Sequence, residues 1–316
     1  MGVLYITNKD YHLKKLGPRI TILDKTNKTV CNVLIREVER LILTSPAQMT
    51  TELVLELLAN DIPIMYMPDG TNTSGVLVPI AGKVTRVMNQ VRIAQNKYKT
   101  GNVVRKLLHA KLQSQQKLLE RFDARMHKNS LSYAVAFINE VEKKIDCTYE
   151  MRNFKFYEKI ASEKYYSCFP LIISQEKFQW SRNGDSLDPM NIMLDFSTNL
   201  LANEITILLR MQGLNITIGY FHNLEDYENG LVLDFMFPFL SGVVDRAVLN
   251  AINLGLVSMD DFKTKDEDGT LVLTEEAKRK WYPIFTASLN RMNIAKTMTY
   301  NKEISKMIRE FSKELN

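Results

Sequence analysis

The stretch KYKTGNVVRKLLHAKLQSQQKLLERF, residues 97–122, sets the fold class. Its apolar residues recur close to the 3.6-residue repeat of an α-helix, at positions 104, 107, 108, 112, 118, 119 and 122. Upstream, short runs rich in Val, Ile, Leu and Tyr alternate with turn-forming residues, a pattern that favours strands. The sequence therefore predicts an α+β protein. A small strand-rich domain covers residues 1–80, and a larger all-helical domain covers residues 81–316.

Two helices carry clear start signals. Thr50 or Thr51 is a suitable N-cap for the leucine-rich helix that follows it. A second helix is expected to begin at the Asp188-Pro189 pair, because aspartate caps a helix well and proline is tolerated at its first position. Gly213 supplies the expected end of that helix.

The net charge of +5 is unevenly distributed. Residues 81–131 contain twelve Lys and Arg against two acidic residues. A basic block is often a solvated helix face, but an excess of this size also suits a phosphate backbone. We expect this segment to contact DNA, with Arg105, Lys106 and Lys111 among the binding residues.

Cysteine and histidine content excludes several classes. The three cysteines are odd in number and far apart, which argues against a disulfide framework and against a clustered zinc site. The same cysteine pattern fits a reducing cytoplasm best. No uncharged apolar run approaches the ~20 residues that span a bilayer. Three histidines have no partner at metal-ligand spacing and are expected at the surface: His12, His109 and His127.

Lone ionisable residues occur inside apolar runs. His222 ends one such run and Asp234 lies in the middle of another, where an unpartnered ionisable group costs several kcal/mol. Pro238 and Gly242 are expected to interrupt the helix that carries Asp234. Glu158 shares an inward helix face with apolar residues three and seven positions further on. These three ionisable residues are therefore candidates for a buried site.

Five separated blocks, in this order, resemble the CRISPR-associated integrase-endonuclease family, the catalytic subunit of spacer acquisition. The strand-rich half, with its threonine-capped helix, is similar to that family as well. The resemblance covers essentially the whole chain. Any one block could match by chance, but the five blocks together are a specific signal for the family. The blocks are YEKIASEKYYSCF (157–169), FQWSRNGDSLDPMNIMLDFSTNLL (178–201), TIGYFH (217–222), LVLDFMFPF (231–239) and DGTLVLTEEAKRKW (268–281).

The resemblance implies a metal site. The family's metal-binding glutamate falls on Glu158 and its histidine on His222, and the implied ion is Mg²⁺ or Mn²⁺. The family's third ligand, an acid, falls on Phe237, which cannot coordinate a metal. The chain therefore departs from the family pattern at one ligand position.

Three hypotheses address this departure. In the first, Asp234 turns inward and completes a catalytic and metal-binding set with Glu158 and His222. In the second, the missing charge comes from the acidic loop that follows His222. In the third, the site has lapsed and the protein keeps only its architecture and its hold on DNA. The loop acids are Glu225, Asp226 and Glu228.

The resemblance also implies supporting residues. Arg182 aligns with a basic residue of the family that could contact a phosphate near the metal. Lys159, the residue after Glu158, is also expected to bind DNA. Tyr165, Asn191 and Asp195 are expected to support the pocket from behind rather than take part in the chemistry.

The activity implied by the resemblance is metal-dependent DNA integration. The 3′-hydroxyl of a captured DNA fragment would be joined to a CRISPR repeat by transesterification, within an integrase that is also an endonuclease. The implied partners are double-stranded DNA, a second copy of the chain bound through the strand domain, and a small ferredoxin-like subunit that bridges two dimers. The alternative is a catalytically weakened, architectural DNA-binding subunit of the same fold. A helical RNA-binding protein fits the sequence less well, because the sequence lacks the exposed aromatic clusters with which such proteins stack on single-stranded bases.

Overall fold

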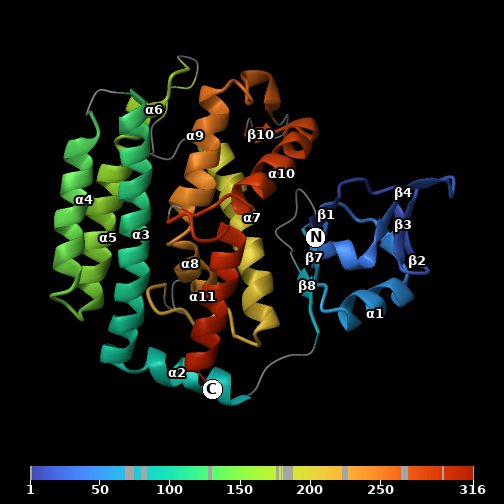
Figure 1. Cartoon of the computed structure of the whole chain (residues 1–316), viewed down its shortest axis with the longest axis horizontal. Coiled ribbons are helices and arrows are strands. Elements are labelled where there is room, and N and C mark those ends of the chain that lie inside the picture. The colour runs from blue at the N-terminus through green and yellow to red at the C-terminus, as the bar shows by residue number, and fades with distance from the viewer. Residues whose placement is uncertain are drawn as a thin grey trace. The chain divides into compact units, whose positions relative to one another are not determined.

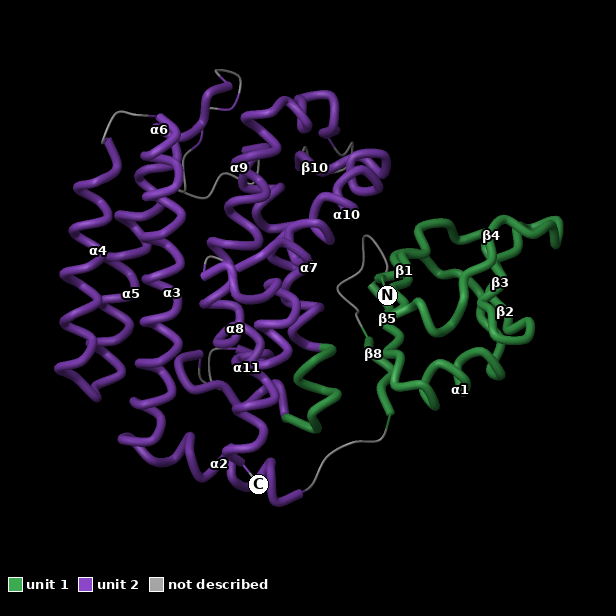
Figure 2. The backbone as a smooth tube through the Cα atoms, in the orientation of Figure 1, with its two compact units in different colours: residues 1–83, 207–214 green, residues 84–206, 215–316 purple. Residues whose placement is uncertain are grey.

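The computed structural model forms two compact units. The first contains residues 1–83 and 207–214, and the second contains residues 84–206 and 215–316 (Figure 2). The sequence prediction placed a single boundary near residue 80 and did not include the 207–214 segment in the first unit. The structure describes residues 2–67, 75–79, 84–126, 130–175, 178, 180, 188–222, 227–264, 270–293 and 295–315.

The first unit contains two four-stranded sheets and one helix. One sheet has the order β1 (Gly2–Ile6), β5 (Val38–Leu43), β7 (Ile64–Tyr66) and β8 (Gly75–Leu77). In this sheet β1, β5 and β7 are parallel, and β8 is antiparallel to β7. The other sheet has the order β4 (Thr29–Leu34), β3 (Arg19–Leu23), β2 (His12–Leu16) and β6 (Gln48–Met49). A short 3₁₀ turn, Ile35–Glu37, precedes β5.

The helix of this unit, α1 (Thr51–Ala59), begins where the sequence predicted. The Thr50 hydroxyl accepts a hydrogen bond from the Leu53 amide, which satisfies one of the free N–H groups at the helix start. Leu53 and Leu57 are fully buried in the core of the unit. A second apolar cluster joins Ile42 and Met65 of the sheet to Ile207.

The second unit is mostly helical (Figure 1). Within it, α3 packs against α4 and α5 and against the segment 240–245. A two-stranded antiparallel hairpin joins β9 (Phe262–Thr264) to β10 (Leu271–Leu273), and a 3₁₀ turn at Met259–Asp261 precedes it. The helices are α2 (Val84–Ala94), α3 (Lys97–Met126), α4 (Ser132–Ile145), α5 (Met151–Tyr166), α6 (Phe169–Ile172), α7 (Pro189–Met211), α8 (Gly230–Met236), α9 (Arg246–Asn253), α10 (Glu275–Leu289) and α11 (Tyr300–Glu314).

The helix that carries Asp234 is interrupted, as predicted. Helix α8 ends at Met236, and the chain then makes a turn and continues as a π-helix, Leu240–Asp245, before α9 begins. A side chain at Gly242 would place its Cβ 2.2 Å from the Tyr300 hydroxyl. Glycine therefore allows the π-helix to lie close to the start of α11.

Helix α7 is long and apolar enough to cross a membrane by length and composition alone. Half of its most apolar window is buried inside the protein. Asp188 caps its first turn, accepting a hydrogen bond from the Met190 amide at 2.8 Å. Its apolar side chains, such as Leu201 and Ile205, lie in the core, so packing accounts for its hydrophobic composition.

Candidate catalytic and DNA-binding site

Glu158 of α5 is held by a lysine of α3. The Lys111 Nζ donates to Glu158 Oε1, and the Ser162 hydroxyl donates to the same oxygen at 2.8 Å. Burial acts to raise the pKa of the Glu158 carboxyl, but the charges and hydrogen bonds around it, chiefly from Lys111, outweigh burial and lower the pKa. His222 contributes to this lowering, so it lies within electrostatic reach of Glu158. The carboxylate is therefore ionised at neutral pH.

His222 is oriented by Asp234. The His222 Nδ1 lies 2.7 Å from Asp234 Oδ1, and the carboxylate also accepts from the backbone amides of Tyr220, Phe221 and His222. Because a carboxylate only accepts, Nδ1 carries the proton and Nε2 is the nitrogen left for a substrate. Asp234 is completely buried, and these four bonds match the number of lone pairs on its two oxygens.

Two glycines shape the loop that presents His222. A Cβ at Gly219 would lie 2.0 Å from the His222 carbonyl oxygen, and a Cβ at Gly230 would lie 2.1 Å from it. No side chain fits at such distances. The loop therefore folds tightly enough to direct its amides at Asp234 only because both positions are glycine.

The Phe237 ring lies beside both Lys111 and His222. Lys111 Nζ sits 4.1 Å from the centre of the Phe237 ring, and the His222 ring centre lies 5.0 Å from it. The lysine thus interacts with the π-face of the ring as well as with a carboxylate. We call the group Lys111, Glu158, His222, Asp234 and Phe237 the inner cluster.

The inner cluster does not fit a divalent ion. Mg²⁺ and Mn²⁺ prefer several oxygen ligands, and a protein site supplies carboxylates for them. Here Glu158 is paired with an ammonium group, Asp234 has its lone pairs committed to other donors, and Phe237 offers an aromatic face. Among the residues that the structure describes, no group of three His, Cys, Asp or Glu side chains could hold a metal ion. The metal predicted from the resemblance stays a prediction.

Of the three acids in the loop after His222, the structure describes only Glu228. Glu225 and Asp226 lie outside the described residues, and Glu228 is exposed. Arg182, the predicted phosphate contact, also lies outside them. Lys159 is exposed on α5 with its Nζ 3.9 Å from Glu163, so it remains a candidate for DNA contact.

The residues expected to support the pocket have other partners. Tyr165 is fully buried, its hydroxyl donates to Asp245 at 2.7 Å, and burial raises its pKa well above the usual value. The Asn191 carbonyl oxygen accepts from the Trp180 indole at 2.8 Å. Asp195 is exposed on α7. The support that these three residues give to the pocket stays a prediction.

The basic residues of α3 divide into two groups. Arg105 donates to the backbone carbonyl oxygens of Ile145 and Thr148 and stacks on Tyr149, and Lys111 is buried in the inner cluster. Both side chains are committed within the protein. Lys106 is exposed, 3.8 Å from Glu314, and it remains available to a phosphate.

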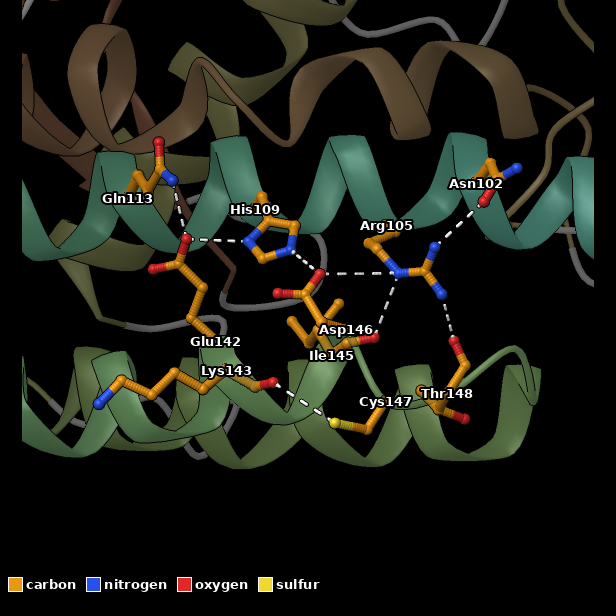
Figure 3. A network of polar contacts seen from close by, with 10 residues as sticks. All are labelled: Asn102, Arg105, His109, Gln113, Glu142, Lys143, Ile145, Asp146, Cys147 and Thr148. Atoms are coloured by element: carbon orange, nitrogen blue, oxygen red, sulfur yellow. Dashed lines mark hydrogen bonds and ion pairs between the residues drawn. The ribbon is translucent and has the colours of Figure 1, made fainter.

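His109 is not the isolated surface residue that the sequence analysis expected. Its Nδ1 lies 2.9 Å from Glu142 and its Nε2 lies 2.9 Å from Asp146, both contributed by the α4 segment (Figure 3). Gln113 of α3 also donates to Glu142, and Arg105 approaches Asp146 at 3.8 Å. We call His109, Glu142, Asp146 and Arg105 the α4 network. It links α3 to α4.

A cationic groove continues along α3. An open cavity of about 930 Å³ is lined by Arg121 and Arg125 of α3, Arg246 of α9 and Arg291. A neighbouring cavity of about 240 Å³ shares three of these arginines and adds Lys117. No acidic residue lines either cavity in the described part of the chain. We call Lys117, Arg121, Arg125, Arg246 and Arg291 the arginine groove.

The groove concentrates positive charge, and two of its buried guanidinium nitrogens lack a hydrogen-bond partner in the described part of the chain. Burial and the neighbouring arginines, Arg291 first, lower the pKa of Arg246 to about 10. Within the described residues, Arg246 Nε and Arg291 Nη1 are buried without a hydrogen-bond partner. Buried donors of this kind are usually satisfied, so an anion is the expected occupant. Sequence reasoning found Arg121 and Arg125 through the basic block but missed Arg291, which lies alone in sequence.

The arginine groove and the inner cluster both lie in the helical second unit. A basic groove of this kind is typical of nucleic-acid-binding proteins. The family model described as CRISPR associated protein Cas1 matches residues 4–286, and the chain belongs to this family. This confirms the resemblance inferred from the five sequence blocks.

Two curated relatives match along most of their length. A CRISPR-associated endonuclease Cas1 of Thermodesulfovibrio yellowstonii is 23% identical over 292 residues, covering 90% of this chain and 90% of the relative. Another from Thermus thermophilus is 24% identical over 297 residues, covering 92% and 85%.

Solved structures share the fold. A casposase bound to its integration product superposes with a TM-score of 0.83 at 20% identity, covering all of this chain and 90% of that one. A Cas1 protein from Thermotoga maritima gives a TM-score of 0.79 at 19% identity, covering 100% and 97%. The predicted fold class, a strand-rich unit followed by a helical one, is confirmed.

Proposed function

We propose that this chain binds double-stranded DNA during CRISPR adaptation and joins the 3′-hydroxyl of a captured fragment to the CRISPR repeat. The observation that carries the proposal is the arginine groove, which lies along α3 and contains no acid among its described lining residues. A phosphate backbone is the ligand that such a surface suits. The names of the curated endonuclease relatives, and the integration product held by the casposase, support the same activity.

The joining step is a transesterification. A bond forms between the attacking 3′-oxygen and a phosphorus of the repeat while the old P–O bond breaks, so no nucleotide cofactor is consumed. In the proposed step His222 takes the hydroxyl proton on Nε2, and the hydrogen bond from Nδ1 to Asp234 supports this role. The protonated ring then returns a proton to the leaving oxygen. Asp234 is a positioning residue in this scheme, acting through His222.

The proposed partners follow the family. We infer that the strand-rich first unit pairs two chains of 36.5 kDa into a homodimer, and that a small ferredoxin-like subunit bridges two dimers. Similar chains have been solved in complexes with Cas2. Because the DNA substrates lie within the cell, the proposed location is the cytoplasm.

A second candidate function is an architectural DNA-binding subunit whose chemistry has lapsed. The contact between Lys111 and Glu158 favours this alternative, because it occupies the carboxylate that a reacting group or ion would use. Both candidates predict DNA binding in the arginine groove. They differ in whether strands are joined.

DNA binding tests the shared part of the proposal. Arg121→Ala combined with Arg125→Ala should reduce the slope of log affinity against log salt by about 2, since each phosphate contact contributes about 0.9. Fluorescence anisotropy with a labelled DNA duplex, titrated at several salt concentrations between about 50 and 200 mM, measures this slope. Lys144→Ala, an exposed basic residue on α4, is the matched control. An unchanged slope in the double variant would remove the groove from the DNA interface.

Strand joining separates the two candidates. The parent should convert a labelled fragment and a repeat duplex into joined product, and His222→Ala should lose at least about a hundredfold of that rate, as expected for a general base. A parent that binds DNA but joins no strands, with or without the ferredoxin-like subunit, would favour the architectural role.

A further inference from the structure

Lys111 is an unusual lysine for its position. Its side chain is 8% exposed, whereas Lys106, five residues earlier on the same helix, is 75% exposed. Lysine is rarely buried unless it is paired. Lys111 is paired twice, with the Glu158 carboxylate and with the face of Phe237.

These two partners surround the ammonium group in a specific way. A carboxylate oxygen satisfies one of its donors, and the negative face of an aromatic ring stabilises the rest of the charge without accepting a conventional hydrogen bond. The His222 ring contacts the same Phe237 ring, with the two ring centres 5.0 Å apart. The ammonium thus contacts Glu158 directly and rests on the ring that His222 also contacts, so a metal ion bound by Glu158 would have to compete with it.

We propose that the Lys111 ammonium is the resident cation of the inner cluster and takes the place of a divalent ion there. The lysine supplies positive charge to the site, Glu158 anchors it, and Phe237 forms the wall against which it rests. This inference rests on the proposed function in treating the inner cluster as the reacting site. Its test measures metal binding and does not depend on strand joining.

The proposal makes Phe237 and Lys111 a matched pair. An acid at position 237 would face the ammonium 4.1 Å from the present ring centre and would form an ion pair with it. Removal of the lysine alone would free Glu158 but leave only two protein ligands, which bind a hard cation poorly. Only the two changes together supply two carboxylates and an imidazole around an unoccupied position.

The first experiment uses the parent. Isothermal titration with MnCl₂ should show no saturable Mn²⁺ binding that depends on Glu158, so parent and Glu158→Gln should give the same trace. Saturable binding by the parent that disappears in Glu158→Gln would overturn the proposal, because the ion would then displace the lysine. This comparison requires no variant of Lys111 to fold.

The second experiment builds the site. Lys111→Met combined with Phe237→Glu should bind Mn²⁺ at least about tenfold more tightly than either single variant, and its melting temperature should rise on addition of Mn²⁺. Lys106→Met combined with Phe237→Glu is the control, since it removes an exposed lysine from the same helix.

The proposal predicts that the effects of the two substitutions on Mn²⁺ affinity are not additive. A gain confined to the double variant supports the proposal, because it shows that the lysine and the missing acid exclude one another. If Phe237→Glu alone, or the Lys106 control, gains the same Mn²⁺ affinity, the ammonium does not block the site and the proposal fails. A folded double variant with no gain in Mn²⁺ affinity would also overturn it.

Discussion

Helix α3 places two polar clusters only two residues apart in sequence, and they differ in kind. His109 points to α4 and joins the α4 network, while Lys111 joins the inner cluster on another face of the helix. Each contains two basic side chains and two carboxylates, and the inner cluster adds the Phe237 ring. In the α4 network Asp146 is 61% exposed to solvent, whereas in the inner cluster Asp234 is completely buried.

The difference shows how burial changes the role of the same chemical groups. Exposed ion pairs contribute little to stability, because water solvates the separated charges nearly as well. Buried charges are costly, and every one that persists must be paired or bonded. The α4 network therefore attaches one helix to another, while the inner cluster holds charges in a fixed arrangement that a loss of any partner would disrupt.

The largest expected effect is at Asp234. Asp234→Ala leaves three buried backbone amides and the His222 ring without an acceptor, and should lower the free energy of unfolding by about 3 to 5 kcal/mol. Urea denaturation of parent and variant measures this. Asp234→Asn, which keeps two of the acceptor sites, should lose clearly less. An Asp234→Ala protein as stable as the parent would mean that the buried carboxylate is not needed by the fold.

A smaller effect is expected from Lys111 and His109, the α3 residues that join the two clusters. Lys111→Met leaves the largely buried Glu158 carboxylate with Ser162 as its remaining donor and should cost about 2 to 3 kcal/mol. His109→Gln should cost less than about 1 kcal/mol, because one of its two partners, Asp146, is solvent-exposed and Glu142 keeps Gln113 and Gln116 as donors. Equal losses in chemical denaturation would contradict the distinction drawn between the clusters.

The smallest effect is a pH dependence confined to the α4 network. Burial acts to lower the pKa of His109, but its hydrogen bonds to Glu142 and Asp146 outweigh burial and raise the pKa above 6.5. The stabilisation is therefore complete below about pH 6.5 and is lost as the pH rises through the raised value. His109→Gln should flatten the parent's decline in unfolding free energy from about pH 6.5 to 8. A decline of the same size in the variant would assign it to other groups.

Local sequence signals predicted much of the fold. The Thr50 cap, the Asp188-Pro189 start of α7 and the break before Gly242 were found because each depends on residues adjacent in sequence. Burial of Glu158 on an inward helix face followed from the helical period. Such signals indicate which side of an element faces the core.

The arrangement inside the site could not be predicted in the same way. Lys111 and Glu158 are 47 residues apart, and helical periodicity does not reveal which residue a buried charge will meet. For Asp234 the sequence showed that a partner was needed, but not that three of its donors would be backbone amides of a loop closed by glycines. Arg246 and Arg291 meet Arg121 only through tertiary packing.

Helix α7 has a consequence for how the protein can be divided. Its residues 189–206 belong to the second unit, while its last turns, with the segment up to residue 214, belong to the first (Figure 2). There Ile207 packs with Ile42 and Met65. A fragment ending near residue 83 would lack part of its own hydrophobic interior, although it contains every strand of the two sheets. The chain is thus not a tandem of interchangeable modules. Gene fusions or duplications that copied only the N-terminal strands would produce a fragment with an incomplete core.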